Sequence, residues 1–187
     1  MAAGKDFAER NSAWLARELQ RLDTQPIRPA PWSIGSEILF RGEMIRLEFA
    51  IDGQPGLIRF GDESLHVSDH AANLRPAIEE YLRRLAEREL PPRVFELASL
   101  HRLTVRRVTV RDQKSRWGSC SRSGSMSLNW RLVQTPALVC DHIILHELMH
   151  LREMNHSSRF WREVERVCPG YQAAELWLKR HSSLLRP

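Results

Sequence analysis

The spacing of hydrophobic positions changes several times along this chain, and each change marks a predicted element. Between residues 7 and 22, apolar residues recur every three or four positions, which predicts an amphipathic helix with one apolar stripe: Phe7, Trp14, Leu15, Leu19 and Leu22. The proline-rich residues 25–31 then predict an extended connector. We therefore expect an N-terminal piece, residues 1–31, followed by one domain over residues 32–187.

From residue 37 onward the period becomes two, which is typical of half-buried strands. Ile45, Leu47, Phe49 and Ile51 alternate with polar or small residues and predict a strand that ends at an Asp52-Gly53 turn. Shorter strands are expected over residues 38–40, 57–60 and 65–67. Together they predict a small antiparallel meander.

The helical period returns over residues 74–85, and Pro91-Pro92 is expected to end that helix before a shorter one that reaches about Leu100. Residues 103–110 predict another strand, a turn is expected around Gly118 and Gly124, and residues 126–132 predict the return strand.

Three helices are predicted after the sheet. The first covers residues 136–152, with Thr135 as N-cap and a proline in the first helical position. Ser157 is expected to cap the second, which Pro169-Gly170 closes. The last carries Leu176, Trp177 and Leu178. Helices and strands that follow one another in separate groups indicate an α+β protein.

Composition narrows the class of protein only modestly. The 187 residues suffice for one domain with a proper core, and no apolar run reaches the roughly 20 residues that cross a bilayer. The N-terminus lacks the apolar stretch of a signal peptide, and three widely spaced cysteines indicate reduced thiols. We therefore expect a cytoplasmic protein without a membrane partner.

The run His146-Glu-Leu-Met-His150 carries the most specific chemistry. Two histidines four residues apart lie on one helix face, so that their imidazole nitrogens can bind one zinc ion. The H-E-x-x-H pattern on a helix is typical of zinc peptidases, in which the glutamate acts on a zinc-bound water. We therefore assign His146 and His150 as zinc ligands and Glu147 as the general base. The alternative is that both are core histidines with hydrogen-bond partners and no metal. Burying two imidazoles beside a carboxylate without a metal would cost folding free energy.

The third zinc ligand is less firmly indicated. The spacing favours His156, which requires the helix to end near Arg152 and the chain to fold back, with Asn155 as a left-handed turn residue. The alternatives are Glu163 or Glu165 on the following helix. His142 lies one turn before His146, too far along the helix to share the ion.

Two further features lie near the predicted chemistry. A second donor for the oxyanion is needed, and Tyr171 and Arg159 are the candidates. The cluster Trp117-Gly-Ser-Cys-Ser121 is either a tight turn with Trp117 in the core or a wall of the active site.

A basic run accounts for the positive charge of this region. It holds seven cations and one acid, Asp112: Arg102, Arg106, Arg107, Arg111, Lys114, Arg116 and Arg122. A solvated strand face is the favoured interpretation and a nucleic-acid groove is the alternative. Strand alternation would send these charges to both faces, so weak, salt-sensitive binding is the most that we expect.

Four segments resemble the YgjP-like metallopeptidases, a family related to the SprT-like and WLM zinc peptidases. They are residues 116–121 (RWGSCS), 128–132 (LNWRL), 146–151 (HELMHL) and 155–161 (NHSSRFW), within a match from about residue 105 to 177. The resemblance implies a compact gluzincin-like zincin fold, in which a short antiparallel sheet packs on the metal-binding helix, with the metal-binding core over residues 105–180. It also implies that His146, His150 and His156 bind zinc and that Glu147 is catalytic.

We therefore predict a zinc metallopeptidase that hydrolyses peptides or unfolded protein segments. Two alternatives follow from the basic run and the family kinship. One is a protease associated with nucleic acid, as in the SprT-like group, and the other is a nucleic-acid-binding adaptor with structural zinc. Glu147 distinguishes an enzyme from the adaptor, because a structural zinc site has four protein ligands and does not need a general base.

Overall fold

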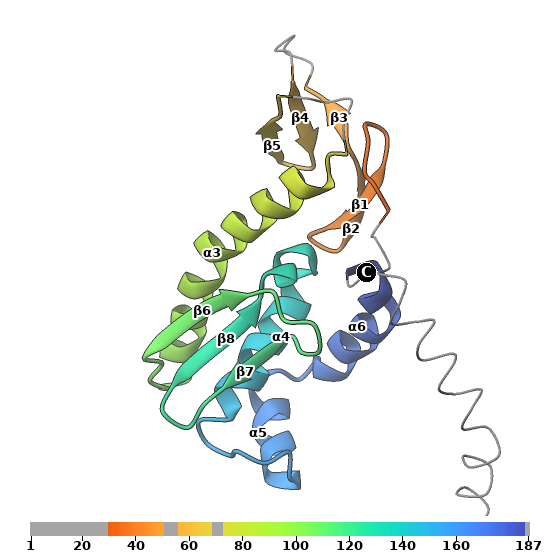
Figure 1. The fold of residues 1–187 in the computed structure, drawn as a ribbon. Coiled ribbons are helices and arrows are strands. Elements are labelled where there is room, and N and C mark those ends of the chain that lie inside the picture. Colours follow the sequence, from red (N-terminus) through yellow and green to blue (C-terminus); the bar gives the residue numbers. More distant parts are fainter. Residues whose placement is uncertain (1–29, 51–55, 69–72, 186–187) are drawn as a thin grey trace, which may run out of the picture. The chain divides into compact units, whose positions relative to one another are not determined.

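The computed structural model describes residues 30–50, 56–68 and 73–185 (Figure 1). The predicted N-terminal helix and the predicted Asp52-Gly53 turn lie outside these ranges. Within them the chain combines helices with small sheets, which confirms the α+β class. In the described part of the chain, no helix combines the length and the apolarity that crossing a membrane requires.

Two small antiparallel sheets come first: β1 (Glu37–Phe40) pairs with β2 (Glu43–Arg46), and β3 (Glu48–Phe49), β4 (Leu57–Phe60) and β5 (Glu63–His66) form a meander. The prediction of one continuous strand from residue 45 onward is wrong, because the strand is interrupted at Leu47, between β2 and β3. The Leu47 N–H donates to the Ser36 carbonyl, and its side chain is fully buried. The alternation of apolar residues therefore runs through two strands that belong to different sheets, β2 and β3.

The long helix α3 (Arg75–Leu100) corrects the prediction that Pro91-Pro92 ends a helix. A proline inside a helix loses one hydrogen bond and crowds the preceding turn, at a cost of about 3 kcal/mol. The helix nevertheless continues, because buried residues lie along it before the prolines, as Leu82 and Leu85 do, and after them, as Val94 and Leu97 do. Tertiary burial on both sides of the prolines therefore outweighs the local penalty.

The central sheet consists of β6 (Arg107–Arg111), β7 (Gly118–Cys120) and β8 (Ser125–Asn129), in the order β6-β8-β7. An antiparallel sheet was predicted, but the sheet is mixed, because β8 pairs antiparallel with β7 and parallel with β6. The predicted turn around Gly118 is the edge strand β7, and the return strand ends at Asn129, where the 3-10 helix η1 (Trp130–Gln134) begins. Gly124, with φ 81°, makes the β7–β8 turn that places β8 between the other two strands.

Helix α4 (Ala137–Met149) carries the H-E-x-x-H run and contacts β7, α3, α5 and α6. Figure 1 shows the central sheet in front of this helix. Its N-cap is Pro136 and not Thr135, whose hydroxyl instead donates to the Leu132 carbonyl of η1. Apolar side chains such as Ile144 and Leu148 are fully buried, so α4 forms the centre of the core.

Two helices complete the chain, α5 (Ser158–Val167) and α6 (Tyr171–Leu185). The prediction that Ser157 caps α5 is confirmed, since its hydroxyl accepts a hydrogen bond from the Phe160 N–H at 3.4 Å. This cap fixes where α5 begins, directly after the loop that carries His156.

Candidate metal centre

Three histidines converge at the C-terminal end of α4. His146 and His150 lie one turn apart on the helix, with ring centroids 5.3 Å apart, and His156 approaches from the α4–α5 loop. The Nε2 atoms of His146 and His156 are 3.0 Å apart. One ring nitrogen from each of the three lies within 4.8 Å of the others, so the group can hold a metal ion.

The chain turns back towards His156 without a left-handed residue. Among the described non-glycine residues, only Arg41 and Arg102 have positive φ, so the expected role of Asn155 is wrong. Instead α4 tightens into a last turn, in which Leu151 and Arg152 donate to carbonyls three residues back. A tightened last turn satisfies the final carbonyls of a helix and needs no positive φ.

Surrounding groups orient the three imidazoles, and burial lowers the pKa of His146 and His150. The Glu153 carbonyl lies 3.2 Å from His150 Nδ1 and accepts a hydrogen bond from its N–H, which leaves Nε2 to face the metal position. The buried Phe160 ring packs against all three histidines at centroid distances of 4.7–4.9 Å. Burial, together with the neighbouring histidines, lowers the pKa of His146 to about 3. Since metal ligands must be deprotonated, neutral imidazoles at this point fit a bound metal ion.

Glu147 lies between the two helical histidines and is 7% exposed. Burial raises the pKa of its carboxyl to about 7, although the charge of Arg116 and a hydrogen bond from the Cys120 backbone N–H act to lower it. Such a pKa suits a group that exchanges protons near neutral pH. Cys120 belongs to β7, so the edge strand holds this carboxylate from across the site.

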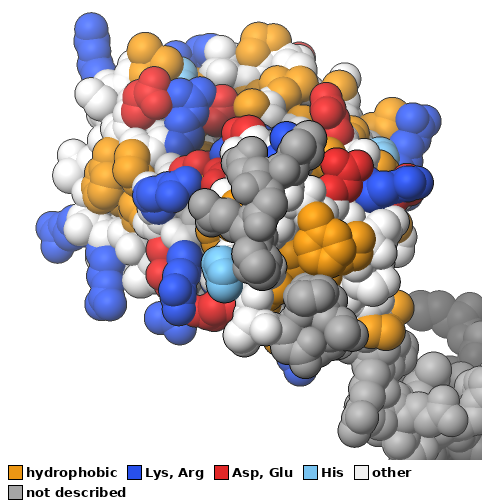
Figure 2. Space-filling view, turned by 90° about the horizontal axis from the view of Figure 1, so that it is seen from above, with side chains coloured by type: hydrophobic (Ala, Val, Ile, Leu, Met, Phe, Trp, Pro, Cys, Tyr) orange, Lys and Arg blue, Asp and Glu red, His pale blue; other side chains and the backbone are white. Residues whose placement is uncertain are grey.

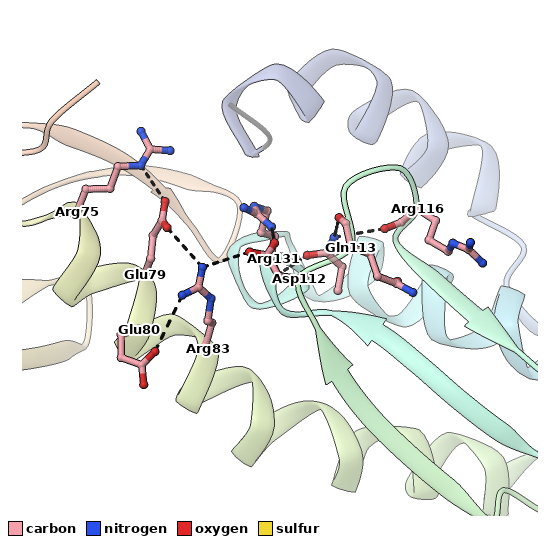
Figure 3. Close-up of polar contacts among 9 residues, drawn as sticks. Arg75, Glu79, Glu80, Arg83, Asp112, Gln113, Arg116 and Arg131 are labelled. Atoms are coloured by element: carbon pink, nitrogen blue, oxygen red, sulfur yellow. Dashed lines mark hydrogen bonds and ion pairs between the residues drawn. The ribbon is translucent and has the colours of Figure 1, made fainter. Parts of the chain in front are cut away.

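Gly118 leaves room for the Glu147 side chain. A Cβ atom at residue 118 would lie 2.6 Å from Glu147 Cγ and 2.8 Å from its Oε1. Both contacts are too short for any side chain, so the glycine is required by close approach and not by backbone conformation. The loop before it is fixed by Asn129, whose Nδ2 donates to the carbonyls of Gln113 at 2.7 Å and Arg116 at 3.2 Å (Figure 3).

The triad and Glu147 line one cavity of about 690 Å³. Of the other predicted site residues, Trp117 lines this cavity, whereas Tyr171 and Arg159 are not among its lining residues. Tyr171 stacks on Trp161 at 5.5 Å, and Arg159 is 78% exposed beside Glu153. The roles predicted for all of these residues stay predictions.

The alternative ligands lie apart from the triad in the described structure. Glu163 is paired with Arg152 at 2.6 Å and Arg166 at 2.8 Å, and Glu165 is exposed. His142 is buried and lines the cavity, but it is not one of the three converging groups. Its Nδ1 has no hydrogen-bond partner among the described residues, and burial lowers its pKa to about 4.

Sequence reasoning missed two charged residues of the cavity wall, Arg116 and Glu175. In Figure 3 the Arg116 side chain points away from the polar network that holds its own carbonyl. Arg116 directly precedes Trp117, so the motif itself contained a signal. No local pattern indicated Glu175, which α6 brings to the cavity from far along the chain.

Comparisons with known proteins identify the family of this chain. The sequence profile of the YgjP-like metallopeptidase domain matches residues 1–181. Among solved structures, the chain is similar to the metallopeptidase zymogen abylysin of Pyrococcus abyssi, with 27% identity over 52% of this chain and 96% of that one, and a TM-score of 0.44. A comparison with curated proteins finds no match. The family profile covers nearly the whole chain, and the chain therefore belongs to the YgjP-like metallopeptidase family.

Proposed function

We propose that this metallopeptidase is a zinc endopeptidase in which His146, His150 and His156 bind the ion and Glu147 is the general base. One observation carries the proposal: three imidazole donors converge on the wall of the cavity that also contains the Glu147 carboxyl group. Family membership gives the class of enzyme, and the arrangement of these four side chains supports the metal and the mechanism.

The donor set favours zinc in a catalytic site. Three imidazole donors suit zinc, and a catalytic zinc site keeps one position open beside three protein ligands. Within the described residues, no fourth histidine, cysteine or carboxylate joins the triad. This argues against the adaptor alternative, because a structural zinc site is closed by four protein ligands.

Glu147 provides the proton transfers. When bound, the zinc ion would supply Lewis acidity, polarising a peptide carbonyl and making a water molecule more acidic. The Glu147 carboxylate then accepts the proton of the attacking water and delivers it to the departing amine. Its hydrogen bond from the Cys120 N–H holds the carboxylate in place, and its pKa of about 7 allows both steps near neutral pH.

Strand β7 offers a place for an extended substrate, because it is the edge of the central sheet. The backbone bonds Asn129 N to Trp117 O and Ser121 N to Ser125 O show which residues of the hairpin face β8. Hydrogen-bonded positions alternate along an antiparallel pair, so Gly118 and Cys120 turn their backbone groups away from β8. The Cys120 N–H donates to Glu147, and the Gly118 groups and the Cys120 carbonyl face the open edge. A peptide segment can add to this edge beside Glu147.

The proposal is tested with Glu147→Gln and the matched exposed control Glu165→Gln. Purified parent and both variants are compared for zinc content and for cleavage of a peptide library, with and without chelator. We expect about one zinc per chain in all three proteins, and hydrolysis lost only in Glu147→Gln. Full chelator-sensitive hydrolysis by Glu147→Gln would refute the mechanism, and loss of zinc from that variant would refute its role as a base.

The cysteines bear on the compartment. All three are free thiols, with Cys168 buried and Cys120 and Cys140 partly buried. Unpaired cysteines are typical of a reducing compartment, which supports a cytoplasmic location as part of this proposal.

A further inference from the structure

We propose that the outer face of the central sheet binds the phosphate backbone of double-stranded nucleic acid. The strand register defines this face, because Thr109 and Ser127 are partners across β6 and β8 and their hydroxyls are 2.8 Å apart. Alternate residues of each strand share that side of the sheet. We call this surface the basic face: Arg107, Thr109 and Arg111 of β6, Ser125 and Ser127 of β8, and Ser119 of β7.

Alternation concentrates the charges of β6 on this face instead of dividing them. Val108 and Val110 lie between Arg107 and Arg111, and both valines pack against the core on the inner side. Arg107 and Arg111 are exposed and therefore share the outer side. The sequence had suggested that strand geometry would scatter the basic run, and the register shows that the two β6 arginines stay together.

Two further arginines lie at one end of the basic face. The β7–β8 turn contacts the start of β6, since both the Arg106 and the Arg107 N–H groups donate to the Gly124 carbonyl. Arg122 belongs to the same turn, and Arg106 and Arg122 are both exposed. Arg107 and Arg111 thus lie on the basic face, and the exposed residues Arg106 and Arg122 belong to the segments at its end.

Many arginines elsewhere in the described chain are paired with acids, although Arg102, Arg116, Arg162 and Arg180 also appear in no ion pair with another described residue. Arg83 and Arg131 contact Asp112 in the network of Figure 3, and Arg93 is paired with Asp141. Figure 2 shows basic and acidic side chains intermixed on another face of the molecule. By contrast, no ion pair with another described residue involves Arg107 and Arg111 of the basic face, or Arg106 and Arg122 beside it. The one acid between residues 102 and 131 is Asp112, which is already paired.

The neighbouring groups indicate phosphate rather than carboxylate partners. Thr109 lies between Arg107 and Arg111 on β6, and Ser125, Ser127 and Ser119 share the same face on the neighbouring strands. Serine, threonine and arginine are among the side chains that contact nucleic-acid phosphates. Arg107 and Arg111 are four residues apart, about 13 Å along a strand at about 3.3 Å per residue. A rigid array of cations at that spacing suits the regular phosphate rows of a duplex.

The same composition favours a duplex over a single strand. Proteins that bind single strands stack bases on aromatic side chains, and the six residues of the basic face include none. Contacts to phosphates alone carry no sequence information, so the binding is expected to be independent of base sequence. Hydrolysis plays no part in this proposal, and Glu147→Gln should bind duplex as the parent does.

The test compares two double variants of the full-length zinc-loaded protein by fluorescence anisotropy. Arg107→Glu/Arg111→Glu reverses two charges of the basic face. Arg46→Glu/Arg59→Glu, the control, changes net charge equally at two exposed arginines that are paired with Glu37 and Glu48. The probes are a labelled 20-base-pair DNA duplex of arbitrary sequence, its single strand, and a poly-glutamate peptide. Circular dichroism and zinc content confirm that both variants are folded.

We expect the parent to bind the duplex with an affinity that falls with salt. Four phosphate contacts would give a slope of log affinity against log salt of about −3.6, and loss of two contacts would reduce it to about −1.8. The basic-face variant should bind at least about tenfold more weakly at low salt, and the control should match the parent. No duplex binding at low salt, equal weakening in both variants, or equal affinity for poly-glutamate would overturn the proposal.

Discussion

Gly118→Ala tests whether the position of the Glu147 carboxylate, set by the edge strand, controls hydrolysis. The added Cβ would lie 2.6 Å from Glu147 Cγ, whereas ordinary van der Waals contact begins at 3.4 Å, so one group must move by about 0.8 Å. Gly118 does not have the left-handed φ that would strain an alanine, and the whole effect therefore passes through Glu147. A misplacement of about 1 Å costs on the order of 100-fold in rate. We expect kcat/KM to fall by about that factor, with zinc content unchanged.

The matched control is Gly170→Ala, at the start of α6. There the nearest atom to a new Cβ is Leu138 Cδ1 at 4.0 Å, which is an ordinary contact, so activity should match the parent. Both variants are assayed on a cleaved peptide, with zinc content and thermal unfolding measured in parallel. If Gly118→Ala retains full activity while it is folded and loaded, hydrolysis does not depend on the carboxylate position described above. If it loses zinc as well, the edge strand supports the ligands rather than the base.

Two other predictions concern the third ligand and the loop before β7. His156→Ala should weaken zinc binding by at least about 100-fold, whereas Glu163→Ala should leave it near the parent value in a competitive chelator titration; the reverse order would move the site to α5. For Asp112, partial burial acts to raise the pKa, but Arg131 and Arg83 lower it below its ordinary value. Its stabilisation is therefore present above the unfolded pKa of about 3.9 and lost as pH falls through the lower folded pKa. The difference in unfolding free energy between parent and Asp112→Asn should be constant above about pH 5 and shrink below about pH 4, and a difference that grows on acidification would contradict this sign.

Local patterns determined those features whose causes lie within a few residues of sequence. The four-residue spacing of His146 and His150 places both rings on one face of any helix, whatever surrounds it. Ser157 caps α5 through an N–H three residues later, and this interaction needs no distant partner. The helical and strand periods gave most element positions for the same reason, and they indicated the α+β class.

Elements whose stability comes from distant contacts were decided by the tertiary structure. α3 continues through Pro91 and Pro92 because burial on both sides of the prolines outweighs their local cost. β8 lies parallel to β6 because the β7–β8 hairpin inserts it between the other strands, and hydrophobic alternation does not encode strand order.

The same distinction between local and distant interactions applies to the candidate site. The sequence placed Glu147 between two histidines on one helix. Only the fold brings His156 within 3.0 Å of His146, and sets the Cys120 N–H and the absent side chain of Gly118 against the Glu147 carboxylate. Likewise, the sequence showed how many arginines the basic run contains, but the strand register determined which of them share a face. Local spacing fixes directions along one element, whereas distances between elements depend on how the whole core packs.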